Sequence, residues 1–122
     1  MPEAIATLAL VLRIATVLQG EGGTIGRLGM VAVGDTMLAR REAGQSWEQV
    51  LSAYYGNARP TGAAREIAEQ MLAHPWKSQG MQFVYSEADR VRYGWPTGDL
   101  TIRRGRWALH LARYWPGGEG DG

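Results

Sequence analysis

One glutamate stands out among the residues that could do chemistry, because Glu21 lies between a long apolar stretch and the Gly22-Gly23 pair. The apolar stretch predicts a helix, so the Glu21 carboxyl lies near a helix C-terminus, where unpaired carbonyls carry partial negative charge. That charge and partial burial both favour the protonated form of a carboxyl. A protonated carboxyl can act as a general acid, and the flanking glycines leave room for a bulky polymer. Position alone favours the simpler alternative, which is a solvated glutamate in a turn.

Composition limits the other chemistries that the chain could perform. With 122 residues, 45% hydrophobic and 20% charged, the chain fits one folded domain and not a disordered segment. Cysteine is absent and the two histidines, His74 and His110, lack ligand-like spacing, so we expect no metal site and no cofactor. A net charge of +1 is too small for a nucleic-acid binder recognised by bulk charge, although Arg103, Arg104 and Arg106 form a local basic cluster.

The apolar N-terminal stretch is predicted to be a central helix over about residues 2–19, which Gly20 with Gly22-Gly23 can stop. Two apolar stripes repeat at helical spacing and are core candidates, one of Ile5, Leu8, Leu12 and Ala15 and the other of Val11, Ile14 and Leu18. No Lys or Arg precedes the stretch, which argues against a secretory signal. Arg13 interrupts it and leaves it short of the roughly 20 apolar residues of a membrane span. We therefore expect neither a signal peptide nor a membrane span.

Three more helices are predicted before residue 76. The first covers about residues 27–43, with Leu28 among its core candidates. The second begins at a capping box formed by Ser46 and Gln49 and ends near Gly56. The third covers about residues 60–75, between two prolines.

The last part of the chain has the character of strands. Residues 81–85 form a short β-like run, and residues 100–104 and 107–114 flank a turn at Gly105. Helices followed by a small antiparallel sheet predict an α+β fold, in which the N-terminal two-thirds is helical. We expect residues 1–116 to form a single domain and residues 117–122 to form a flexible, Gly-rich tail.

Two blocks of the sequence resemble a known family. Residues 17–23 read VLQGEGG and residues 29–40 read GMVAVGDTMLAR. They are similar to the cell-wall hydrolase family of the spore-cortex-lytic enzyme catalytic domain. In that family an apolar helix leads into Ala-Glu-Ala-Arg-Gly-Glu, and a second helix reads Gly-Gln-Val-Ala-Val-Gly-Ala-Val-Val-Leu-Asn-Arg. On this resemblance Glu21 falls on the family's catalytic glutamate.

The resemblance continues more weakly toward the C-terminus. Residues 80–86 read GMQFVYS, which puts Tyr85 on the tyrosine of the family's Gly-Ala-Thr-His-Phe-Tyr-Asn stretch, and Trp95 and the hairpin follow in the same order. The chain departs from the family's pattern at four positions, and these departures predict remodelled substrate contacts. The departures are Gly23, Ile25, Ala39 and Phe83, where the family has Arg, Glu, Asn and His.

The resemblance implies a lysozyme-like fold that cleaves the β-1,4 bond between N-acetylmuramic acid and N-acetylglucosamine in peptidoglycan. Glu21 would act as the general acid and then as the base of a lytic transglycosylase, a reaction that needs no second carboxylate. A two-carboxylate hydrolase is the alternative outcome, with Glu87 or Asp89 as the second group.

Four residues are predicted to bind the glycan, namely Tyr85, Trp95, Gly22 and Gly23. Aromatic rings such as that of Trp95 pack against sugar C–H surfaces. Tyr85 could hydrogen-bond the substrate or steady Glu21, and a strand tyrosine with its ring in the core is an equal alternative.

The implied partner is the peptidoglycan glycan strand, and we expect no nucleic-acid partner and a monomeric protein. Such an enzyme would be made in the cytoplasm without a signal peptide and would act on the cell wall, as a phage endolysin or virion-associated lysin does. The rival interpretation is a catalytically silent glycan-binding or virion structural module of the same fold. A weaker rival is a nucleic-acid-binding domain that uses the arginine-rich hairpin.

Overall fold

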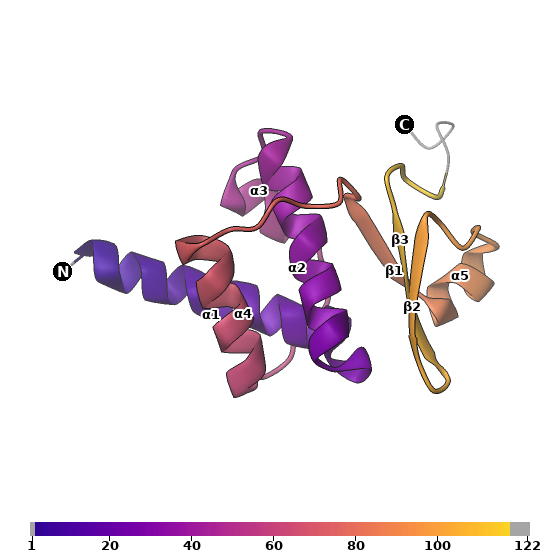
Figure 1. The fold of residues 1–122 in the computed structure, drawn as a ribbon, viewed down its shortest axis with the longest axis horizontal. Helices are drawn as coiled ribbons and strands as arrows, with labels where there is room; N and C mark the ends of the chain where they lie inside the picture. Colours follow the sequence, from indigo (N-terminus) through magenta and orange to yellow (C-terminus); the bar gives the residue numbers. More distant parts are fainter. Residues whose placement is uncertain (1, 118–122) are drawn as a thin grey trace.

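The computed structural model describes the backbone of residues 2–117 and the side chains of residues 7–117. The predicted tail, residues 117–122, therefore lies outside the described residues except for Gly117. The helices come first and a small sheet follows, which confirms the predicted α+β class (Figure 1). The helices are α1 (Pro2–Gly22), the short 3-10 helix η1 (Gly23–Ile25), α2 (Arg27–Glu42), α3 (Trp47–Ser52), α4 (Gly62–Ala73) and α5 (Glu87–Tyr93). The strands are β1 (Phe83–Ser86), β2 (Leu100–Arg104) and β3 (Trp107–Ala112).

The core lies where α1, α2 and α4 pack together, and one of the two predicted stripes of α1 supplies its centre. Val11, Ile14 and Leu18 are buried there, as predicted, among apolar side chains of α2, α3 and α4. The capping box that begins α3 is present, because the Ser46 hydroxyl accepts from the Gln49 amide and the Gln49 side chain accepts from the Ser46 amide.

Three predictions about the first two helices were wrong. Leu8 and Leu12 are exposed, at 59% and 37%, because the N-terminal part of α1 extends beyond the helices that cover its C-terminal part (Figure 1). Leu28 is also exposed, at 61%, in the first turn of α2. α1 extends beyond the predicted end near residue 19 and past Gly20, and it ends at Gly22, the second of the predicted stop residues. Glu21 therefore lies in the last turn of a helix and not in the turn that follows it.

The apolar character of α1 raises the question of a membrane span. Within the described part of the chain, one stretch, Thr7–Ile25, is long and apolar enough to cross a membrane, with a mean hydropathy of 1.2. A third of that stretch is buried in the fold. Core helices of soluble proteins meet the same criteria, so the absence of a membrane span stays a prediction.

The sheet is antiparallel and has the strand order β1-β3-β2. Tyr85, on the edge strand β1, pairs with His110, on the central strand β3. The predicted hairpin turns at Gly105, whose φ of 58° lies in the left-handed region that favours glycine. β3 ends at Ala112, two residues before the predicted end.

Helix α5 was not predicted from the sequence. It begins directly after β1, where the Ser86 hydroxyl accepts a hydrogen bond from the Asp89 amide, and it ends at Gly94, which has a φ of 68°. Its position beside the sheet brings the segment 87–95 to the same side of the molecule as the end of α1.

Candidate functional site

A groove of about 1110 Å³ lies where the helical part meets the sheet. Its residues come from the last turn of α1, the end of α2, the segment after α3, the sheet, and α5 with the residues that follow it. Five of the seven residues predicted for the site line it together, namely Glu21, Tyr85, Glu87, Asp89 and Trp95. The tertiary structure thus brings together residues that are up to 74 positions apart in the chain.

Glu21 is held in the groove by backbone amides. Its Oε1 atom accepts hydrogen bonds from the backbone N–H of Tyr55, at 3.1 Å, and of Gly56, at 2.6 Å. Its Oε2 atom accepts no hydrogen bond from any described residue. The side chain is half-buried, so one oxygen is anchored by the protein while the other is left for a ligand or water.

The segment that donates these bonds lies directly against α1 because of two glycines. A Cβ atom on Gly20 would lie 2.2 Å from the backbone nitrogen of Asn57, and one on Gly56 would lie 2.6 Å from Cγ of Glu21. The same segment is tied to α1 by the Ala58 amide, which donates to the Thr16 carbonyl at 3.1 Å. The backbone bonds of residues 55–58 are therefore made to α1, which explains why α3 ends at Ser52 and not near Gly56.

Gly22 and Gly23, which were predicted to contact the glycan, do not line the groove. Gly22 is buried against α2, where a Cβ atom would lie 2.5 Å from the Gly29 carbonyl oxygen. A Cβ atom on Gly23 would lie 2.5 Å from the Gln19 side-chain nitrogen. Both glycines allow parts of this protein to approach each other, and neither opens space for a polymer.

A second polar group lies next to Glu21 on the helical side of the groove. The Tyr54 and Thr36 hydroxyls are 2.8 Å apart, and the Arg40 Cζ atom lies 5.7 Å from the centre of the Tyr54 ring. Burial raises the pKa of the Tyr54 phenol, and the charge of Glu21 adds to this effect, while Thr36 and Arg40 oppose it. Tyr54 is therefore a neutral hydroxyl beside the carboxyl that the sequence singles out.

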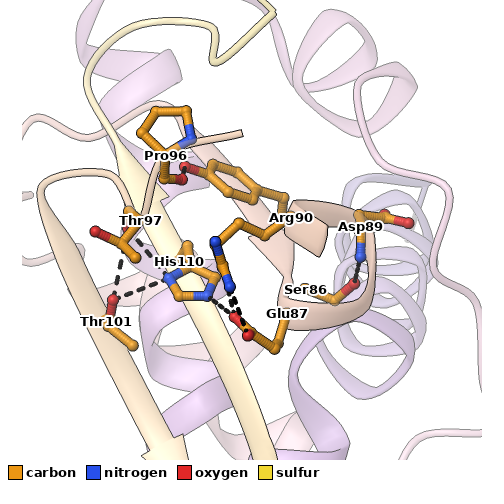
Figure 2. A network of polar contacts seen from close by, with 9 residues as sticks. Ser86, Glu87, Asp89, Arg90, Pro96, Thr97, Thr101 and His110 are labelled. Carbon is orange, nitrogen blue, oxygen red and sulfur yellow. Dashed lines mark hydrogen bonds and ion pairs between the residues drawn. The ribbon is translucent and has the colours of Figure 1, made fainter. Parts of the chain in front are cut away.

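Glu87 has the opposite environment, because both of its oxygens are occupied (Figure 2). Arg90 binds it with two N–H groups, at 2.7 and 2.9 Å, and His110 Nε2 lies 2.6 Å from Oε1. The Arg90 and His110 hydrogen bonds lower the pKa of Glu87 to about 2. Glu87 is therefore an ionised carboxylate held by cation and imidazole, which leaves it poorly suited to act as a base or nucleophile.

Buried His110 links several segments of the sheet side. Its Nδ1 atom lies 2.9 Å from the Thr101 hydroxyl and 3.1 Å from the Thr97 carbonyl (Figure 2). His110 therefore joins α5 to β2 and to the segment before it, which is a structural role. Asp89 lies in the first turn of α5 with its side chain exposed, so it remains the second carboxylate of the groove that has no cation bound to it among the described residues.

Tyr85 uses its hydroxyl within the protein. The hydroxyl donates to the Pro96 carbonyl, and only 5% of the residue is exposed. The sequence allowed either a substrate or Glu21 contact or a core position, and the geometry corresponds to the core position. Its ring still forms part of the groove wall.

Five aromatic residues line the sheet side of the groove in one connected group, here called the aromatic wall. Tyr93 stacks on Trp95 at 4.8 Å between ring centres, and Trp95 contacts Tyr85 and Trp115 edge to face, each at 5.2 Å. Trp115 in turn lies 5.6 Å from Phe83. The aromatic wall therefore consists of Phe83, Tyr85, Tyr93, Trp95 and Trp115.

Sequence reasoning found only part of this wall. Tyr93 belongs to α5, whose capping signal, a serine three residues before Asp89, is present in the sequence and was overlooked. No local signal places Trp115 beside Trp95, because the contact depends on how the chain turns after β3. The amides of Tyr55 and Gly56 also carry no sequence signal.

Two further observations concern groups outside the groove. Asp35 of α2 is buried, and it accepts from the Trp76 indole N–H at 2.8 Å and from the Gln79 amide at 3.0 Å. It therefore ties α2 to the linker before β1. Within the residues that the structure describes, no group of three or more His, Asp or Glu side chains is arranged to hold a metal ion.

Comparisons with protein-family models, with curated proteins and with solved structures found no match to this chain. The predicted relation to the cell-wall hydrolase family therefore depends on the sequence motifs and on the groove described above.

Proposed function

We propose that this protein cleaves the β-1,4 bond between N-acetylmuramic acid and N-acetylglucosamine in peptidoglycan, as a lytic transglycosylase with Glu21 as its general acid and base. One observation carries the proposal. Glu21, with one carboxyl oxygen anchored and the other without a partner among the described residues, lies in the same groove as the aromatic wall.

The aromatic wall is suited to a glycan. The apolar faces of aromatic rings pack on the C–H surfaces of pyranose rings, and exposed rings lose little conformational entropy when they bind. Tyr93 and Trp115 are about half exposed, at 55% and 48%, so their faces are accessible to a ligand in the groove. A volume of about 1110 Å³ is at the upper end of ordinary ligand pockets, which suits an extended strand more than a single small molecule.

Transglycosylation needs only one reactive carboxyl, and Glu21 can supply it. Protonated Glu21 donates its proton to the glycosidic oxygen, and the bond between that oxygen and C1 of muramic acid breaks. The Glu21 carboxylate then takes the proton of the muramic C6 hydroxyl while O6 bonds to C1 and closes a 1,6-anhydro ring. Glu21 ends protonated, so the cycle balances without water.

A two-carboxylate hydrolase is supported less well. Such an enzyme needs a second carboxyl about 5 to 9 Å from the first that is free to activate water or to attack C1. Glu87 is occupied by Arg90 and His110, and its pKa of about 2 makes it a weak base. Asp89 is the remaining candidate for that role.

The experiment is digestion of purified sacculi followed by mass spectrometry of the released sugars. Muropeptides with 1,6-anhydro ends are expected. Reducing ends would replace transglycosylation by hydrolysis and would direct attention to Asp89, whereas no release from sacculi that bind the protein would contradict catalysis.

A catalytically silent glycan-binding module is the second candidate, and one contact favours it. The hydrogen bonds that two backbone amides donate to Glu21 tie the segment after α3 to α1. This carboxylate therefore has a structural role even if the protein catalyses no reaction. Binding to sacculi with no release, unchanged in a Glu21→Gln variant, would identify this second function.

A further inference from the structure

The groove contains a cation that the proposed reaction does not use. Arg40 lies in the last turn of α2, lines the groove, and is half-buried. No carboxylate of a described residue lies within ion-pair distance of it. A half-buried cation without a counter-ion is unfavourable unless another group neutralises it, which makes Arg40 a candidate ligand contact.

The Arg40 guanidinium is held in a fixed orientation. Its Nε–H donates to the Gln82 carbonyl at 2.7 Å, and its Cζ atom lies 4.9 Å from the centre of the Phe83 ring and 5.7 Å from that of Tyr54. The remaining N–H groups of the guanidinium have no acceptor among the described residues.

This arrangement suits a carboxylate. A guanidinium can present two parallel N–H groups to the two oxygens of a carboxylate, and a fixed, partly desolvated guanidinium makes stronger bonds than a mobile one on the surface. Phe83 belongs to the aromatic wall, so a sugar packed on that wall would carry its substituents past Arg40.

We propose that Arg40 is a specificity-determining residue that binds a carboxylate attached to the muramic sugar, so that the groove prefers acidic glycan strands to neutral ones. This inference rests on the proposed function, because it takes the occupant of the groove to be a peptidoglycan strand. The carboxylate can be that of the lactyl ether on O3 or one of the peptide stem, and both are carried by the same sugar.

The test is a binding measurement in the Glu21→Gln variant, which keeps the strands intact during titration calorimetry. Three ligands are compared: strands with their peptide stems, strands stripped of stems so that the lactyl carboxylates are free, and stripped strands whose carboxylates have been converted to amides. Acidic strands are expected to bind about tenfold or more tightly than the amidated strands, which is the scale of a charged hydrogen bond.

In the Glu21→Gln variant, a further Arg40→Gln change should abolish the preference for acidic over amidated strands. Arg40→Lys should keep part of this preference, because lysine is a point charge without the planar guanidinium fork. Arg41→Gln is the matched control. Arg41 is the next residue of α2, is exposed, binds the Gln45 carbonyl, and does not line the groove, so the preference should survive. Arg106→Gln is the second comparison, because Arg106 lines the groove near Trp107.

Each outcome decides the inference. If Arg40→Gln loses the preference for stripped acidic strands over amidated strands, Arg40 binds the lactyl carboxylate. If Arg40→Gln loses only the preference for stem-bearing strands, Arg40 binds a carboxylate of the peptide stem. A preference that survives Arg40→Gln, or that disappears in Arg106→Gln alone, overturns the role of Arg40. Equal binding of acidic and amidated strands overturns this inference while the proposed function stands, whereas binding of no strand overturns both.

Discussion

The two walls of the groove hold their carboxylates in different ways. On the helical wall, Glu21 is bound by two backbone amides through one oxygen, and its other oxygen is unoccupied by described residues. On the sheet wall, Glu87 has both oxygens occupied by Arg90 and His110, which lower its pKa to about 2. Both side chains line one groove, yet of these two carboxyls only Glu21 keeps an oxygen without a partner among the described residues.

The difference shows how neighbours decide what a carboxyl can do. A cation beside a carboxylate stabilises the charged form strongly, so the group becomes a structural anion. Amides on one oxygen orient the group and leave the second oxygen for proton transfer. We therefore propose a catalytic role for Glu21 and a structural role for Glu87.

The sharpest test of this contrast is Glu21→Gln. Turnover of sacculi, measured as released muropeptides, is expected to fall by at least about a hundredfold, because glutamine cannot donate the carboxyl proton. Glu66→Gln is the control, since Glu66 lies on the exposed side of α4 and pairs with Arg27 outside the groove. Near-parental release by a folded Glu21→Gln variant would contradict the assignment.

The helical wall should be sensitive to any side chain at Gly20. Gly20→Ala is expected to destabilise the protein by about 1–3 kcal/mol, because its Cβ atom would overlap the Asn57 backbone and the segment that binds Glu21 would have to move. Chemical denaturation measures this loss, and activity should fall with it.

The matched control for this variant is Gly62→Ala at the start of α4, where a Cβ atom would meet nothing within 4 Å. That variant should be neutral or slightly stabilising, by about 0.4–1 kcal/mol. Equal stability of the two alanine variants would mean that the close approach at Gly20 does not matter.

The stability of the sheet wall should depend on pH through the ionisation of Glu87. Because the fold lowers the pKa of Glu87 from 4.5 to about 2, its stabilising effect is fully present above 4.5 and is lost as the pH falls toward 2. Thermal melts of the parent protein should therefore decline more steeply over this range than those of Glu87→Gln. Parallel declines would show that the Arg90 and His110 contacts do not stabilise the fold.

The smallest effect is expected from Tyr85→Phe. This change removes the hydrogen bond to the Pro96 carbonyl and keeps the ring, so stability should fall by only about 0.5–1.5 kcal/mol and release from sacculi should change little. A large loss of release without a change in the melting temperature would return the Tyr85 hydroxyl to the reaction.

Local patterns were sufficient for most of the fold. Helical spacing and capping signals located α1 to α4, and turn residues located the hairpin, because these elements depend on neighbouring residues. Burial was harder to predict for α1. Leu8 and Ile14 look alike in the sequence, but Leu8 is 59% exposed, whereas Ile14 is fully buried in the core with side chains of α2, α3 and α4.

The candidate site divides in the same way. The position of Glu21 at the end of an apolar helix, and its agreement with a family motif, could be found in the sequence. What the glycines around it do could not, because Gly20 and Gly22 face backbone segments that lie far along the chain or across a helix pair. Spacing in sequence carries no information about which backbone will fill the space beside a glycine.

By itself, then, the sequence determined the helices, the hairpin and the carboxyl that ends α1, since each is encoded by residues within a few turns of one another. Only the tertiary structure decided that His110 lies against Glu87, that five aromatic rings form one wall, and that Arg40 lies in the groove without a carboxylate partner among the described residues. The physical reason is that charge pairing, ring contacts and burial depend on which distant segments pack together, and packing is a property of the whole fold.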